Sequence, residues 1–287
     1  MAVASLFAGG ISAAIAQPLP IFDAHIHYSR PAWEAFSPDA ILKILDRGGV
    51  RRAFVSSTPD DGTLRLYRRA PGRIVPVLRP YRTPEDMNAW HRNPEILAYL
   101  KERIRKGGGI YRGIGEFHMG RGDAGSEVFR RVAALAARKN LFLHAHVDEV
   151  ALEEILRLAP EVCVLWAHAG MTAEPETVGR LLDRYPNLWV ELALRWDVSH
   201  SGALIPEWRD RFLRHPDRFL VGTDTWVNNQ WEVLPETLDG YRIWLRTLPR
   251  GVREKIAHGN AERLAKPQAS GKPQAPGPDR PRPRGKT

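Results

Sequence analysis

Apolar residues recur along the chain in eight short runs, separated by longer stretches that alternate apolar and polar faces. The stretches between the runs show the spacing of three to four residues that is typical of amphipathic helices. Strand and helix alternate eight times over about 245 residues, which favours one α/β domain, a (β/α)8 or TIM barrel, over two open-sheet halves. The predicted strands are Ile21–His27, Ala53–Ser57, Ile74–Arg79, Ile110–Glu116, Leu141–His146, Val162–His168, Leu188–Leu194 and Phe219–Asp224.

Several of the helical stretches have recognisable end signals. Asp148 and Thr172 each precede an apolar stripe and are predicted N-caps. The helix after Asp148 is predicted to end before Pro160, and the helix after Thr172 before Pro186. Asn140 is the predicted end of a helix that carries Val128, Val132 and Leu135. These signals fix the order of elements around the predicted barrel.

The two ends of the chain differ from the body between residues 21 and 265. Residues 1–20 hold no charge and contain Ala14-Ile15-Ala16 before Gln17, an A-x-A pattern typical of a signal peptide. We therefore expect a periplasmic or secreted protein. The alternative is an unstructured N-terminus on a cytoplasmic protein, because the positive region of a signal peptide is missing. Residues 266–287 form a basic, proline-rich tail without large apolar residues, and we expect it to be disordered.

Composition limits the function classes. The formal net charge of the 287 residues is +9, but the tail contributes six Lys and Arg residues against one Asp, so little of the excess belongs to the barrel. We expect a small-molecule substrate, with a homo-oligomer possible in principle and no specific nucleic-acid partner. The body has no apolar run long enough to span a membrane. A single cysteine excludes an intrachain disulfide framework and a cysteine-rich metal cluster.

Acidic and imidazole side chains end several predicted strands. Active sites of TIM barrels lie at the C-terminal ends of the strands, so these side chains are expected to meet. Buried charged groups require partners, and a bound metal ion would explain the whole set. The set comprises Asp23, His25 and His27 on the first strand, Glu116 on the fourth, His146 on the fifth, His168 on the sixth and Asp224 on the eighth.

Strand geometry says more about the first and fifth strands. His25 and His27 point to the same face, with Cα atoms about 7 Å apart, and Asp23 on that face could hold an imidazole N–H. His144 and His146 also share a face. His146 lies at the strand end and is the preferred ligand, whereas His144 is expected deeper, as a hydrogen-bonded core histidine.

The chain resembles the amidohydrolase superfamily of metal-dependent barrel hydrolases. The resemblance rests on Asp-x-His-x-His ending strand one, a histidine ending strands five and six, Val-Gly-Thr-Asp ending strand eight, and the late segment His258–Leu264. Gly113-Ile114-Gly115-Glu116 is further similar to strand four of TatD-type hydrolases, where the glutamate binds metal. No candidate for the carbamylated lysine of other members is found.

The resemblance implies a ligand set and a mechanism. His25, His27 and Asp224 would hold one ion, His146 and His168 a second, and Glu116 would bridge them. Asp224 would act as general base, and in members with one ion His168 would be an acid/base catalyst instead of a ligand.

Imidazole and carboxylate donors without thiolate suit one or two divalent ions, zinc first, with manganese, nickel or iron as alternatives. Polar and aromatic residues after the strands are candidate substrate contacts. We predict a metal-dependent hydrolase of a small amide, ester or lactone. An anionic substrate would suit the arginines after the strands, because arginine binds carboxylate and phosphate. A TatD-like phosphodiesterase and a decarboxylase or hydratase are the alternatives. The candidate substrate contacts are Arg79, Arg195, Trp226 and Asn228.

Overall fold

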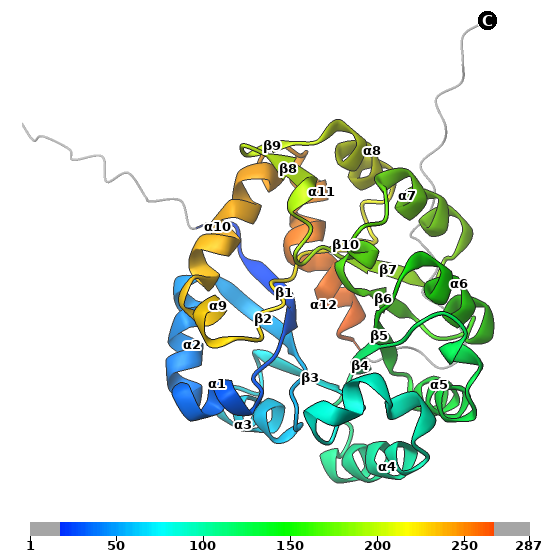
Figure 1. Cartoon of the computed structure of the whole chain (residues 1–287). Coiled ribbons are helices and arrows are strands. Elements are labelled where there is room, and N and C mark those ends of the chain that lie inside the picture. The colour runs from blue at the N-terminus through cyan, green and yellow to red at the C-terminus, as the bar shows by residue number, and fades with distance from the viewer. Residues whose placement is uncertain (1–17, 267–287) are drawn as a thin grey trace, which may run out of the picture.

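Eight parallel strands form a nearly closed barrel in the computed structural model, which describes residues 18–266 (Figure 1). Each barrel strand pairs with the next barrel strand along the chain, and the last two pair with each other because the two short strands between them form a separate hairpin. This order confirms the predicted (β/α)8 barrel. The predicted signal segment, apart from residues 18–20, and the basic tail after residue 266 lie outside the described residues. The strands are β1 Ile21–Ile26, β2 Val50–Val55, β3 Ile74–Leu78, β4 Gly113–His118, β5 Phe142–His146, β6 Val164–Trp166, β7 Leu188–Glu191 and β10 Phe219–Leu220.

The barrel closes between the segment after β10 and β1. The amide N of Ala24 donates to O of Val221 at 3.0 Å, and the amide N of Asp224 donates to O of His25 at 2.8 Å. Three predicted strands, the sixth, seventh and eighth, are much shorter than expected. Their predicted last residues His168, Leu194 and Asp224 adopt φ of 56°, 57° and 48°, which extended strand cannot accommodate. His168 lies in the short 3-10 helix Ala167–Gly170 that follows β6, and Asp224 lies in the segment that follows β10.

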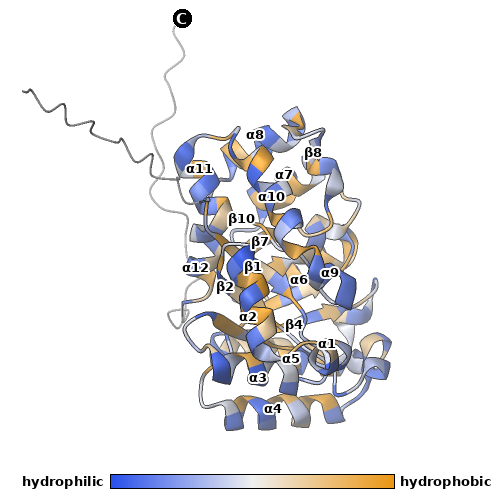
Figure 2. Cartoon of the chain, turned by 90° about the vertical axis from the view of Figure 1, so that its left-hand side faces the viewer, coloured by the Kyte–Doolittle hydropathy of each residue, from blue (hydrophilic) through white to orange (hydrophobic). Residues whose placement is uncertain are grey.

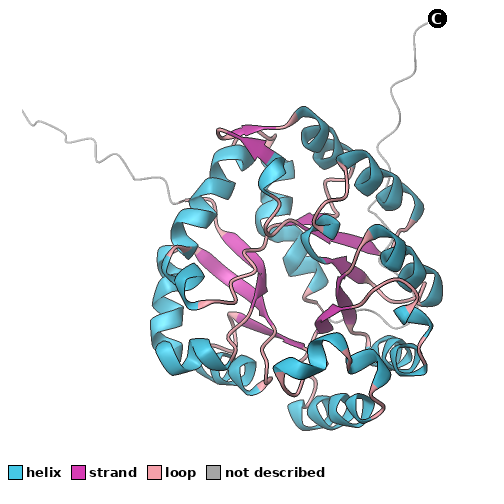
Figure 3. Ribbon diagram, in the orientation of Figure 1, coloured by secondary structure: helices cyan, strands magenta, loops and turns pink. Residues whose placement is uncertain are grey.

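Helices surround the strands as a ring (Figure 3). A short hairpin, β8 Ser199–His200 and β9 Ala203–Leu204, extends the loop after β7. Within residues 18–266, no helix combines the length and apolar character needed to cross a membrane. The helices are α1 Arg30–Ala35, α2 Pro38–Arg47, α3 Asp61–Arg69, α4 Glu95–Gly107, α5 Glu127–Lys139, α6 Glu149–Leu158, α7 Pro175–Arg184, α8 Pro206–Arg214, α9 Asn228–Glu232, α10 Leu234–Leu245, α11 Arg250–Glu254 and α12 Asn260–Leu264.

Four of the five predicted helix ends are confirmed. α6 ends at Leu158 and α7 ends at Arg184, so Pro160 and Pro186 lie just beyond them as predicted. The Asp148 side chain caps α6 by accepting a hydrogen bond from the amide N of Ala151. Asn140 ends α5 in the left-handed conformation, with φ of 53°. The predicted cap at Thr172 is wrong, because α7 begins at Pro175 with Glu174 as its N-cap, and proline at the first helical position needs no amide partner.

Apolar side chains fill the barrel interior toward the N-terminal ends of the strands. The rings of Phe22 and Phe54 lie 4.8 Å apart, and those of Phe54 and Phe142 lie 5.1 Å apart. Leu264 of α12 belongs to the same buried cluster. Orange, hydrophobic segments accordingly lie along the strands in Figure 2, with blue, hydrophilic positions mostly on the outer helices. The polar chemistry of the interior is therefore confined to the C-terminal ends of the strands.

Candidate metal centre

Four side chains from three parts of the barrel converge at the C-terminal end of β1. Nε2 of His25 and Nε2 of His27 lie 3.0 Å apart. Nε2 of His27 lies 3.2 Å from Oε2 of Glu116 and 3.1 Å from Oδ1 of Asp224. All four residues are buried, and their donor atoms lie within 4.8 Å of one another. This is a compact arrangement of two imidazoles and two carboxylates.

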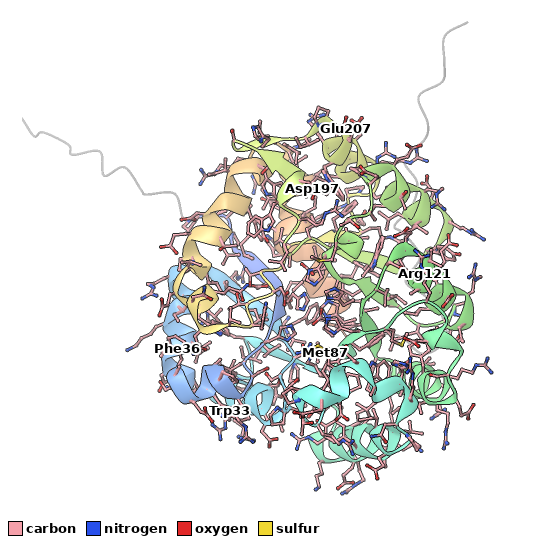
Figure 4. The ribbon with its side chains drawn as sticks, viewed as in Figure 1. Trp33, Phe36, Met87, Arg121, Asp197 and Glu207 are labelled. Carbon is pink, nitrogen blue, oxygen red and sulfur yellow. The ribbon has the colours of Figure 1, made fainter. Side chains whose placement is uncertain are left out.

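A second group of donors shares Glu116. Its other oxygen, Oε1, lies 2.8 Å from Nδ1 of His146 and 3.5 Å from Nε2 of His168. The carboxylate thus faces the histidines of β1 with one oxygen and those of β5 and β6 with the other. Nitrogen-bearing side chains gather in the middle of the strand ring in Figure 4. The structure brings together all six side chains that the resemblance assigned as ligands.

A glycine allows β4 to bring Glu116 to this position. Gly115 has φ of 135°, and a Cβ at this position would clash with the backbone oxygen of His144 on β5. Only glycine adopts such a backbone without strain. The close approach of the two strands places Glu116 beside His146.

His144 lies deeper than His146, as the strand geometry indicated. Its ring centroid is 4.4 Å from that of His25, and its Nε2 is buried without a hydrogen-bond partner. Burial, reinforced by the charge of His25, holds the pKa of His144 well below its ordinary value. The ring is therefore neutral, and the three groups of donors that could hold an ion do not include it.

Sequence reasoning missed Glu191 on β7. Its Oε2 lies 3.0 Å from Nδ1 of His25 and accepts a hydrogen bond from the amide N of His168 at 3.3 Å. The signal was present, since a glutamate inside the apolar run Leu188–Leu194 is buried and needs a partner. Gly222 makes room for it, because a Cβ there would lie 2.6 Å from Oε1 of Glu191.

Asp23 does not hold an imidazole, contrary to the sequence-based expectation. Its carboxylate accepts hydrogen bonds from the amide N of His25 and from the amide N and Oγ1 of Thr223, at 2.7–3.1 Å. Burial raises the pKa of Asp23 to about 7 despite these bonds. Asp23 thus fixes the backbone of β1 to the segment after β10, and Glu191 is the carboxylate that contacts the imidazole.

The buried carboxylates depend on neighbouring positive charge. Burial alone would raise the pKa of Glu116, but the charge of His25 and the hydrogen bond from His146 hold that pKa well below its usual value. Burial would lower the pKa of His25, but Asp224 and Glu116 raise it well above the ordinary range. A bound cation would supply the same compensation to the carboxylates.

The donor set fits a divalent cation. Nε2 of His168 is buried without a hydrogen-bond partner, while its Nδ1 lies 3.1 Å from the carbonyl oxygen of Ala193. The other ring nitrogen of His25 contacts Glu191 in the same way. In His25 and His168, therefore, one ring nitrogen is held by the protein and the other is turned toward the carboxylates, as in metal-binding histidines.

The two arginines predicted to bind substrate already bind protein groups. Nη2 of Arg79 lies 3.0 Å from Oε2 of Glu116, and its Nε donates to the carbonyl oxygen of the same residue. Arg195 pairs with Asp197 and donates to the carbonyl oxygens of Ala169 and Ala173. Arg195 thus ties together the loops after β6 and β7. An anionic substrate would have to displace one of these partners.

The aromatic and amide candidates lie on the loop that follows β10. Trp226 is 55% exposed. Nδ2 of Asn228, the first residue of α9, lies 3.4 Å from the carbonyl oxygen of Pro31. Neither residue contacts the buried donors, so a contact with substrate would come from the outer part of the site.

A pocket of about 430 Å³ opens beside the second group of donors. His146 lines it together with His118, whose ring lies 4.3 Å from that of His146. Two carboxylates also line it, and each is paired with an arginine outside the lining, Asp148 with Arg121 and Asp123 with Arg92. Figure 4 shows Arg121 toward the outside of the ring. The two acidic charges of the pocket wall are therefore compensated by arginine.

Comparison with protein families identifies the class of this chain. The model of the amidohydrolase family matches residues 60–265, more than two thirds of the sequence. The chain belongs to the amidohydrolase family. It is an enzyme of the hydrolase type, and its buried cluster fits a divalent metal.

Solved structures share the fold at low sequence identity. A protein from Pseudomonas putida described as a candidate 2-pyrone-4,6-dicarboxylic acid hydrolase has a TM-score of 0.60 at 13% identity, over 86% of this chain and 97% of its own. A TatD homologue from Escherichia coli has a TM-score of 0.60 at 15% identity, over 85% and 97%. An amidohydrolase from Pseudomonas aeruginosa has a TM-score of 0.56 at 11% identity, over 86% and 96%. No curated protein sequence matches this chain significantly.

Proposed function

We propose that the protein hydrolyses a small carbonyl compound, an amide, ester or lactone, with water activated by one or two divalent metal ions. The observation that carries the proposal is the convergence of His25, His27, Glu116 and Asp224 within 4.8 Å. Glu116 also contacts His146, which lines a pocket of about 430 Å³. Pockets of this size suit small molecules. Membership of the amidohydrolase family supports the same chemistry.

The proposed ligands form two groups that share one carboxylate. His25, His27 and Asp224 would hold the first ion, His146 and His168 the second, and Glu116 would bridge them, with zinc the first choice and manganese, nickel or iron the alternatives. A divalent ion supplies two effects when bound, a water pKa lowered to about 7 and polarisation of the substrate carbonyl.

Asp224 is the proposed general base. Its side chain is 10% exposed, compared with 3% for Glu116, so it is the more accessible carboxylate of the cluster. Its Oδ2 lies 3.8 Å from Nε2 of His168. From this position Asp224 takes a proton from the attacking water and returns it to the leaving group. His168, with Nδ1 held by Ala193, keeps Nε2 directed at the same point and serves as acid/base catalyst if a single ion is bound.

Because both carboxylates of the pocket wall are paired with arginine, the pocket favours an uncharged substrate part beside His118 and His146. Binding of a carboxylate-bearing substrate would require Arg79 to exchange Glu116 for the substrate, or Arg195 to release Asp197. Trp226 and Asn228 are proposed contacts at the outer part of the site. Cleavage of a phosphodiester is the second candidate function, since Glu116 stands at the strand-four position where TatD-type hydrolases carry a metal-binding glutamate.

The test combines metal analysis with a substrate panel. Purified protein is assayed for bound metal, treated with a chelator, and tested against esters, lactones, amides and phosphodiesters before and after zinc is restored. We expect carbonyl hydrolysis that is lost on chelation and recovered with metal. Full activity after complete metal removal would refute the proposal. Faster turnover of phosphodiesters would replace it with the nuclease-like function, and carbon dioxide release with the decarboxylase function.

A further inference from the structure

A second cavity lies at the opposite end of the barrel from the metal centre. It is a groove of about 750 Å³, lined by the ends of α4 and α5 and by the segments that lead into β4 and β5. These segments precede their strands, whereas the donors of the metal centre follow theirs. Five cationic side chains and no carboxylate line this groove, which we call the basic groove. The cations are Lys101, Arg105, Arg112, Arg138 and Lys139.

Most of these cations lack a carboxylate partner. Arg105 pairs with Glu102, which lies outside the lining. Within residues 18–266, Lys101, Arg138 and Lys139 have no carboxylate within 4.0 Å, and Arg112 binds only carbonyl oxygens, those of Gly109, Tyr111 and Ala265. Another cluster of cations does have a carboxylate partner, since Arg157, Arg180 and Arg184 all lie within 4.0 Å of Glu153. The basic groove therefore concentrates positive charge that the protein does not neutralise.

Helix ends explain only part of this charge. Cations in the last turn complement the negative C-terminal end of a helix, and Arg105, Arg138 and Lys139 occupy such positions. Lys101 lies in the middle of α4, and Arg112 lies beyond its end. The N-terminal end of a TIM barrel is its stability face, where a concave cluster of uncompensated like charge is a cost. A ligand of opposite charge would remove that cost.

The apolar lining of the basic groove and the position of Ala265 beside it also favour a ligand here. Ile104, Leu135 and Leu141 also line the groove, so apolar surface lies beneath the cationic rim. Arg112, on the rim, holds the carbonyl oxygen of Ala265, and the residues from Lys266 onward carry six Lys and Arg residues against one Asp. The chain therefore leaves the barrel beside the groove with further positive charge.

We propose that the basic groove binds a multiply charged organic phosphate, with its phosphates on the cationic rim and its organic part on the apolar floor. Charge-assisted contacts from lysine and arginine are the usual means of phosphate recognition, and a volume of about 750 Å³ accommodates a ligand of nucleotide size. The site is independent of the hydrolase chemistry, because no side chain is common to the two.

The test measures binding of inorganic tripolyphosphate and of ATP to the full chain by calorimetry, at low and at physiological salt. The groove variant K101Q/R138Q/K139Q removes three cations that lack a carboxylate partner. The matched control K43Q/R47Q/R68Q removes three exposed cations of α2 and α3 that likewise have no ion pair within the described part of the chain. Both variants keep the metal centre intact and change the net charge equally.

We expect saturable binding by the wild-type protein, a loss of at least about tenfold in affinity for the groove variant, and a change of less than about twofold for the control. Tighter binding of ATP than of tripolyphosphate would identify the organic part as a contributor. Equal affinities would reduce the ligand to inorganic polyphosphate and overturn the role of the apolar floor. Absence of saturable binding, or equal losses in both triple variants, would overturn the site.

Discussion

Oε2 of Glu191, at the end of β7, lies 3.0 Å from Nδ1 of His25 on β1. β7 does not pair with β1 but with β10. The contact fixes which nitrogen of His25 carries the proton and turns Nε2 toward His27 and Glu116. A residue of the seventh strand thus orients a proposed ligand of the first.

Glu191→Gln should weaken metal binding by about 10- to 100-fold, because carboxylate partners of ligating histidines orient the ring and raise its basicity. Metal affinity is measured by competition with a chromophoric chelator, with circular dichroism as the check on folding. The matched control is Glu207→Gln on α8, at an exposed position, which should bind metal like the wild-type protein. Unchanged affinity in the Glu191 variant would show that the contact does not support the centre.

Asp224→Asn should reduce kcat by at least about 100-fold, since general-base catalysis contributes roughly 10²- to 10⁴-fold. The amide keeps the shape of the side chain but cannot accept the proton of the water. Rates are measured on the substrate found by the panel, at saturating metal, with metal content determined on the same sample. Asp210→Asn, on the exposed face of α8, is the control. Activity close to wild type with metal bound would remove Asp224 from the mechanism.

Gly115→Ala should destabilise the fold by more than about 1 kcal/mol, because the new Cβ meets the backbone oxygen of His144 and φ of 135° is strained for alanine. Urea denaturation measures the change in the free energy of unfolding. Gly72→Ala is the control, since a Cβ at Gly72 meets no atom within 4 Å. That substitution should leave stability unchanged or raise it by up to about 1 kcal/mol. Equal effects at the two glycines would contradict the close approach of β4 and β5.

Asp217→Asn tests a pH-dependent contribution to stability far from the metal centre. Lys255 and Arg263 each place a nitrogen within 3.0 Å of the Asp217 carboxylate. Burial opposes ionisation, but the hydrogen bonds from these two cations hold the pKa of Asp217 below its ordinary value. Because the folded-state pKa is lower than the unfolded one, the stabilisation is present above the unfolded value of about 3.9 and is lost as the pH falls through the folded value.

The substitution should therefore cost about 1–2 kcal/mol at pH 7 and progressively less below pH 4, where wild type and variant both become neutral at this position. Urea denaturation of metal-free protein at a series of pH values gives the comparison. A cost that stays the same from pH 7 to the acid end would mean that the charge of Asp217 contributes nothing.

The order of strands was predictable because each apolar run is separated from the next by a helical stripe. The positions of His25, His27, Glu116, His146, His168 and Asp224 followed from the single rule that strand ends meet at one face. Strand lengths did not follow, since the left-handed turns at His168 and Asp224 have no signature in the local apolar pattern. The hydrogen-bond and ion-pair partners of individual side chains could not be predicted from the apolar pattern either. Asp23 binds Thr223, and Arg195 binds Asp197, through contacts that depend on how β1 closes against the segment after β10 and on how the loops fold.

The aromatic rings of Phe22, Phe54 and Phe142 pack together in the barrel interior and close it at the end opposite the metal centre. Substrate and product must then share one opening, and the next substrate molecule cannot reach the proposed metal ions until the previous product has departed. Changes in the loops around that opening, far from the bond being broken, are therefore expected to set the turnover rate whenever release is the slow step.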